Sequence, residues 1–242
     1  AIEDLGSLGG SQSLAAFENR KGEVAITSET GATDPYLNVP QANCLWLPNG
    51  FATSCGEFDF GTNIFLLPVS SQTHAAANSQ SGLLDLGTLG GPDSSVYDIN
   101  DKGLAVGWSY TNGTAGASGV PDTRPVVWIH GKPKDMGSLG GTFGAAIQIN
   151  RNGQATGASN LAGDTVVHSF VWDKASKHMT DLGSFGGWYS HPNWINDNGD
   201  VVGISSYADN TRRAFYWHNN MLQDLGTIDT DDRSVAVGVN NV

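Results

Sequence analysis

The sequence predicts an all-β protein built from internal repeats, and three observations carry this prediction. No stretch shows a sustained helical period. Short runs rich in Val, Ile, Phe or Trp alternate with Gly, Asn and Asp, four runs to each repeat. A glycine-containing block recurs five times, as DLGSLGG, DLGTLGG, DMGSLGG, DLGSFGG and DLGTIDT, beginning at Asp4, Asp85, Asp135, Asp181 and Asp224. Four strands in roughly 45 residues are the dimensions of a β-propeller blade.

The first element of each repeat is this block, which we interpret as structural. An Asp before a glycine-rich turn accepts backbone N–H groups, Leu enters the core, and glycine allows a positive φ. The second element is an asparagine, followed three residues later by Gly in the first four repeats: Asn19, Asn100, Asn150, Asn196 and Asn240. This spacing predicts a tight Asx-type turn between two strands. Asp197, Asn198 and Asp200 belong to such a turn, because the closing Glu of a calcium loop is absent.

The third element is a short strand near glycine, such as those that begin at Leu104 and Val201. The fourth is an apolar run that ends in tryptophan, at Trp46, Trp128, Trp172 and Trp217. These indole rings recur at one position of the repeat, so we expect them to pack between sheets rather than to bind a ligand.

The number of runs falls two strands short of five full blades. Residues 56–60 and 63–69, inside an insert at 47–83, have strand-like patterns and would supply both. We therefore expect residues 1–242 to form one five-bladed propeller domain. A four-bladed ring with an extra hairpin is the alternative.

Two cysteines, Cys44 and Cys55, lie close together in a stretch rich in Gly, Pro, Asn and Ser. In an oxidising compartment a disulfide between them would close a short loop at the insert and stabilise it. In a reducing compartment both would remain small apolar side chains.

The repeated blocks resemble the HAF family of extracellular repeats, named for a His-Ala-Phe sequence before the tryptophan. The nearest matches are His168-Ser169-Phe170 and Arg213-Ala214-Phe215. The resemblance covers nearly the whole chain, apart from about 47–83 and 110–122. It implies a secreted, extracellular repeat protein, and it transfers no catalytic residue because the family carries no settled activity.

Charge and composition exclude several partners. With 12 Lys+Arg against 24 Asp+Glu, the formal net charge is −12, which disfavours nucleic acids and anionic membranes. No apolar run approaches the roughly 20 residues that a membrane span needs. The six histidines are scattered without metal-ligand spacing, so we expect no metal or other cofactor. A calcium ion on the propeller axis is the alternative.

The connections between the third and fourth elements vary most, at about 27–41, 108–123, 158–166 and 204–212. Binding residues concentrate on variable loops of a rigid scaffold, so this face is the expected ligand face. The aromatic residues that depart from the repeat are the candidates: Trp188, Tyr189, His191, Trp194, Trp108, Tyr110 and Tyr207. Exposed aromatic faces beside polar groups suit sugar rings. The alternative is that these side chains fill gaps between blades.

Three functions follow as hypotheses. The leading one is a secreted propeller that binds an extracellular saccharide through this face. The second is a polysaccharide lyase or hydrolase, in which His191 and Tyr189 act as base and acid while Arg212 or Arg213 holds the carboxylate of an acidic sugar. The third is a structural or adhesive surface module. Whether the protein is an enzyme stays open at this point.

Overall fold

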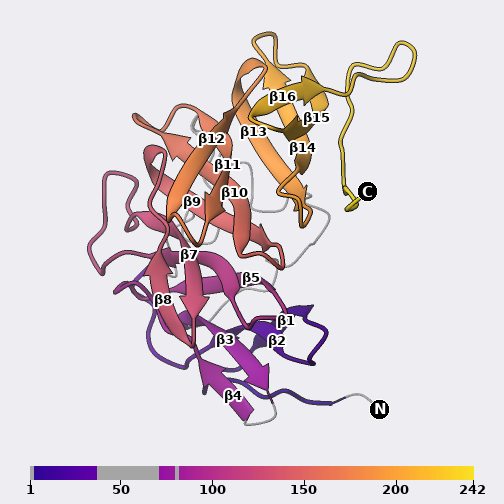
Figure 1. The fold of residues 1–242 in the computed structure, drawn as a ribbon. Helices are drawn as coiled ribbons and strands as arrows, with labels where there is room; N and C mark the ends of the chain where they lie inside the picture. The colour runs from indigo at the N-terminus through magenta and orange to yellow at the C-terminus, as the bar shows by residue number, and fades with distance from the viewer. Residues whose placement is uncertain (1–2, 37–70, 80–81) are drawn as a thin grey trace.

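A computed structural model describes residues 3–36, 71–79 and 82–242, and it is all-β as predicted. Sixteen strands follow one another along the described residues (Figure 1). They are β1 (Ser13–Glu18), β2 (Val24–Glu29), β3 (Thr73–Ser79), β4 (Gly82–Asp85), β5 (Ser94–Ile99), β6 (Ala105–Tyr110), β7 (Thr123–Ile129), β8 (Lys132–Asp135), β9 (Gly140–Ile149), β10 (Gln154–Leu161), β11 (Val167–Asp173), β12 (His178–Gly183), β13 (Gly186–Ile195), β14 (Val201–Tyr207), β15 (Arg212–His218) and β16 (Met221–Asp224).

Each consecutive set of four strands forms one antiparallel meander, which we call a unit. The first unit is β1–β4, the second β5–β8, the third β9–β12 and the fourth β13–β16. A parallel bridge between Val167 and Tyr189 joins the third and fourth units into one eight-stranded sheet. The repeat length of the sequence therefore corresponds to one four-stranded meander, as expected.

The units do not close into a ring, which corrects both the five-bladed and the four-bladed prediction. The described strands form sheets of four, four and eight strands, and within them no strand of the first unit pairs with one of the fourth. In Figure 1 these two units lie at opposite ends of the molecule. Within the described residues no further meander follows β16, and the one β-bridge formed by the segment after β16 joins Arg233 to Arg212 at the start of β15. A further blade needs a full set of paired strands.

The third strand of the first unit also differs from the expectation. The predicted run ended at Trp46, whereas the strand that pairs with β2 is β3, which lies within the predicted insert 47–83. In β3, Asn78 pairs with Val24 of β2. At the equivalent position the second and third units have a tryptophan, Trp128 and Trp172. The sequence pattern missed β3 because this strand has Asn78 in place of the tryptophan. Trp46, Cys44, Cys55 and the strands expected at 56–60 and 63–69 lie outside the described residues.

Apolar side chains pack between successive units. Trp128 of the second unit packs with Ala25 and Ala75 of the first. The interface of the second and third units buries Trp172 and Phe170 in the same way. Burial of these rings contributes to the hydrophobic stabilisation between sheets, and the prediction that Trp128 and Trp172 pack there is confirmed.

The repeated asparagines form a ladder that connects all the units. Their Nδ2 groups donate to the backbone carbonyl of the next asparagine in the row: Asn19 to Asn100 (2.9 Å), Asn100 to Asn150 (2.9 Å), Asn150 to Asn196 (2.8 Å) and Asn196 to Asn240 (2.6 Å). In the first four, Oδ1 accepts backbone N–H groups of its own turn, two and four residues on. The predicted Asx turn is confirmed, and the same side chain also bonds to the next unit, which the spacing alone did not indicate.

The blocks that begin with Asp connect one unit to the next. In each block the Asp Oδ1 accepts the N–H of the glycine two residues on, at 2.7 to 2.9 Å, as predicted. Two histidines, at equivalent positions of the first and third units, bond to the Asp of a block. His74 pairs through Nδ1 with Asp85 at 2.9 Å, and His168 pairs with Asp181 at 2.9 Å. In these two units the histidine therefore contacts the block that begins with Asp.

Candidate functional site

The structure separates the predicted ligand-binding aromatics into different places. Trp108 and Tyr110, at the end of β6, lie in a cluster with Tyr36 and Phe143. The Tyr110 ring makes edge contacts with Trp108 at 5.3 Å and with Tyr36 at 5.9 Å, and the residue is only 1% exposed. Burial and the nearby Asp93 carboxylate raise the pKa of its hydroxyl. Tyr110 is therefore a core residue, as the gap-filling alternative predicts.

A second aromatic group lies on β13. The Trp188 and Tyr189 ring centroids are 5.4 Å apart, and the Tyr189 and His191 rings stack at 6.2 Å with an interplanar angle of 11°. The Arg212 guanidinium lies over the Tyr189 ring, 5.4 Å from its centroid. Cation–π attraction of this kind holds the arginine against the strand.

The two candidate acid–base residues are buried. His191 and Tyr189 are each 5% exposed. Burial lowers the pKa of His191 to about 4 and raises that of the Tyr189 hydroxyl. At neutral pH His191 is an uncharged ring stacked in the interior, and neither side chain faces a molecule at the surface. The geometry gives the lyase or hydrolase hypothesis no support.

Because His191 is buried, we expect the protein to lose stability in acid. In the unfolded state this histidine takes up a proton near its ordinary pKa of 6.5, whereas in the folded state it does so only near pH 4. Between these values the unfolded state binds more protons, so the free energy of unfolding falls as the pH falls, by up to about 3 kcal/mol from this residue. Urea unfolding of the wild type and of His191→Gln at pH 7 and pH 4.5 measures it. We expect the variant to lose less stability across this interval; equal losses would contradict the assignment.

The remaining candidates occupy other positions. Trp194 is 40% exposed near the far end of β13. Tyr207 stacks on Phe185 at 5.1 Å, and its hydroxyl donates to Asp224 Oδ2 at 2.8 Å, a bond that raises the pKa of Tyr207. Arg213 donates from Nη1 to the carbonyl of Asp231 at 3.5 Å. Of the predicted residues, Trp188, Tyr189, His191 and Arg212 form one group, and Trp108 and Tyr110 form a separate, more deeply buried one.

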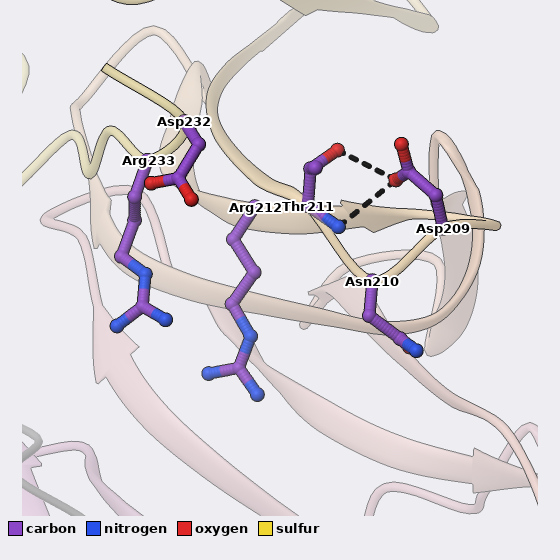
Figure 2. A pocket seen from close by; sticks show the side chains of 6 residues that line it. All are labelled: Asp209, Asn210, Thr211, Arg212, Asp232 and Arg233. Carbon is purple, nitrogen blue, oxygen red and sulfur yellow. Dashed lines mark hydrogen bonds between the residues drawn. The ribbon is translucent and has the colours of Figure 1, made fainter.

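A polar cavity of about 190 Å³ lies beside this group. Figure 2 shows the residues that line it, from the β14–β15 connection and from the segment after β16: Asp209, Asn210, Thr211, Arg212, Asp232 and Arg233. Residues 209–212 belong to the connection 204–212 of the predicted ligand face. The cavity therefore lies at one of the four connections that sequence variability indicated.

Local hydrogen bonds fix both walls of the cavity. Asp209 Oδ1 accepts the backbone N–H of Thr211 at 2.9 Å and its hydroxyl at 2.7 Å, which closes the turn. On the other wall, Ser234 donates its N–H to the carbonyl of Arg212 at 3.2 Å and accepts the N–H of Ala214 through Oγ at 2.9 Å. The segment after β16 is thereby held against β15.

Asn210 connects the cavity to the aromatic group. Trp188 Nε1 donates to Asn210 Oδ1 at 2.8 Å, so the indole ring stands beside the cavity in a fixed orientation. Asn210 has a φ of 67°, which Asn tolerates better than most residues. An indole face next to amide, hydroxyl and carboxylate groups is able to bind a ligand that has an apolar face and several hydroxyls.

Sequence reasoning missed Arg233 and Asp232. The available signal was the fifth recurrence, DLGTIDT, which departs from the double-glycine pattern and continues into a charged stretch.

In the part of the chain that the structure describes, no three His, Cys, Asp or Glu side chains are grouped to hold a metal ion. Nor does any helix there have the length and apolar character to cross a bilayer.

No protein-family model matches the chain, and a comparison with curated proteins finds no significant relative. The site is therefore defined by its own geometry: a polar cavity at one end of a repeat protein, beside a tethered tryptophan.

Proposed function

We propose that the protein is a saccharide-binding repeat protein, and that the cavity beside Trp188 is its binding site. The observation that carries the proposal is the bond from Trp188 Nε1 to Asn210, which places an indole at a cavity lined by polar side chains. The C–H face of a sugar stacks on an aromatic ring while its hydroxyls bond to amides, hydroxyls and carboxylates.

The size of the cavity supports a small occupant. Sites for drug-sized molecules are typically about 300–1,000 Å³, and this cavity of about 190 Å³ suits a single sugar unit or the end of a chain. Because Trp188 is already held by Asn210, its orientation costs little entropy on binding.

A glycan-array screen followed by titration calorimetry tests the proposal with two tryptophan variants. We expect Trp188→Ala to weaken binding about tenfold or more, since the loss of a stacked ring removes both area and aromatic contact. Trp194→Ala is the matched control, because Trp194 is an exposed indole on the same strand outside the cavity. Equal losses in both variants, or binding that survives in Trp188→Ala, would contradict the site. Titrations with calcium and with a chelator test whether calcium takes part in binding.

We also propose an extracellular location and a relationship to the HAF repeats. The support is that His168, in the run that resembles the family motif, and His74, at the equivalent position of the first unit, each pair with the Asp of a recurring block. Mass spectrometry of the secreted fraction of the source cells tests the location.

One observation favours the third function, a structural or adhesive module. Ile228 and Val237, in the segment after β16, are 78% and 76% exposed. Exposed apolar residues of this kind mark association surfaces when they are contiguous. Two results together would favour this function over saccharide binding. No glycan would bind in the array screen, and the protein would self-associate in a concentration-dependent manner that Val237→Asp abolishes.

A further inference from the structure

Two arginines of the cavity extend their charged groups to the same side. Figure 2 shows the guanidinium groups of Arg212 and Arg233 pointing together, with the Asn210 amide on that side. A backbone bridge pairs the two arginines directly, so their side chains start from neighbouring backbone positions. Like charges on neighbouring residues repel one another, and an anion between them would relieve the repulsion.

Three of the other four described arginines have an acidic partner, and the fourth, Arg213, donates to the backbone carbonyl of Asp231 instead. Arg20, Arg124 and Arg151 each form an ion pair, with Asp101, Asp122 and Asp197. No ion pair within the described ranges involves Arg212 or Arg233, although the protein has twice as many acidic as basic residues. Guanidinium groups without an acidic partner in so acidic a protein are available to an external carboxylate, which arginine binds in a bidentate manner.

The acidic residues of the cavity do not neutralise this pair. Asp209 uses Oδ1 for the two bonds to Thr211, and those bonds lower its pKa. In Figure 2 the carboxylates of Asp209 and Asp232 both lie on the side away from the guanidinium groups. The cavity therefore has a donor side and an acceptor side, which is the polarity that an acidic sugar, with one carboxylate and several hydroxyls, requires.

The Asn210 amide lies on the same side of the cavity as the guanidinium groups, with its Nδ2 group pointing away from them. Its Oδ1 accepts the bond from Trp188. At physiological ionic strength charges more than about 8 Å away are largely screened, so the overall charge of −12 does not cancel the local attraction.

We propose that the ligand of this cavity is an acidic saccharide, whose carboxylate is held between Arg212 and Arg233 while its ring packs beside Trp188. The proposal rests on the proposed saccharide-binding function and adds the class of sugar. The sequence hypothesis gave the carboxylate to Arg212 or Arg213; the proposal keeps Arg212 and adds Arg233, because Arg213 does not line the cavity.

Titration calorimetry with paired ligands tests this proposal. The ligands are oligosaccharides of galacturonate, glucuronate and mannuronate, each compared with its methyl ester, which keeps the sugar and removes the charge. Inorganic phosphate serves as a free anion. We expect at least one uronate to bind tenfold or more tightly than its ester and to bind more tightly than phosphate.

The variants assign that preference to the two arginines. We expect Arg212→Gln and Arg233→Gln each to weaken uronate binding about tenfold while changing ester binding by less than twofold. Arg151→Gln, an exposed arginine of another unit, is the control and should change neither. Unfolding curves show whether each variant remains folded.

The outcomes separate this proposal from the proposed function. If ester and acid bind equally well through Trp188, saccharide binding stands and the acidic specificity is overturned. If phosphate binds as tightly as every uronate, the arginines form an ion site only, and the proposal is also overturned. If no saccharide binds, both proposals fail.

Discussion

A Gly157→Ala variant is expected to lose about 3 kcal/mol or more of its free energy of unfolding. A Cβ atom at this position would lie 2.0 Å from the carbonyl oxygen of Ala145 and 2.7 Å from the Cα of Ala146. Both atoms belong to the backbone of β9, so the strand itself would have to move, and forced repacking of this kind is among the costliest of single substitutions. Urea unfolding followed by circular dichroism gives the value.

The same close approach occurs in the neighbouring units. A Cβ on Gly107 would lie 1.9 Å from the carbonyl oxygen of Ser95, and one on Gly203 would lie 2.1 Å from that of His191. All three glycines face a β-bulge of the first strand of their unit. The bulge brings the first strand close to the second, and only glycine leaves room for it.

Gly113→Ala is the matched control, because a Cβ there would meet no atom within 4 Å. We expect it to change stability by less than about 0.5 kcal/mol, as for most surface substitutions. The first unit has Ile26 opposite its own bulge, so this sheet tolerates a side chain at the equivalent position. A Gly157→Ala variant as stable as Gly113→Ala would show that the third unit adapts in the same way, and the prediction would then be wrong.

Asn150→Asp is expected to destabilise the protein by about 3 kcal/mol or more at pH 7, and by much less in acid. The substitution keeps the acceptor for the turn but removes the Nδ2 donor, which bonds to the carbonyl of Asn196 at 2.8 Å and to Gln154 Oε1 at 2.8 Å. An ionised carboxylate would then face two oxygen atoms in a position that is 5% exposed, a large cost for a buried charge.

The loss of stability in Asn150→Asp depends on pH because the new carboxyl group titrates. Burial and the facing oxygens raise the pKa of the new carboxyl in the folded state above its unfolded value of about 3.9. The folded state therefore holds a proton that the unfolded state releases, and stability falls as the pH rises through this interval. A protonated carboxyl donates one hydrogen bond and restores part of the ladder.

Chemical unfolding of Asn150→Asp and wild type at pH 7 and pH 4 measures the difference. Asn152→Asp is the control, because Asn152 is exposed and its amide bonds outside the ladder, to the carbonyl of Asp197 at 2.6 Å. A penalty for Asn150→Asp that is the same at both pH values would mean that the ladder does not depend on the Nδ2 donor.

Part of the site could be predicted from the sequence. Trp188, Tyr189 and His191 depart from the repeat at one place, and the structure does place them in one aromatic group. Their exposure was not predictable, because alternate residues of a strand face opposite ways and the packing of the neighbouring unit decides which face is covered. Tyr189 and His191 are buried within their group, and Tyr110, which departs from the repeat in the same manner, is buried against Tyr36 and Phe143.

The sequence by itself determined the all-β class, the four-stranded repeat and the chemistry of its turns. These features depend on interactions within a few residues, such as Asp135 with the N–H of Gly137 or Asn100 with the N–H of Lys102, and the repeat displays them several times. The tertiary structure alone decided that the units remain an open row, that the turn asparagines join neighbouring units, and that Arg233 pairs with Arg212 at the cavity. Such contacts join residues from different repeats, so they depend on how whole sheets pack and where the chain returns, which local patterns do not specify.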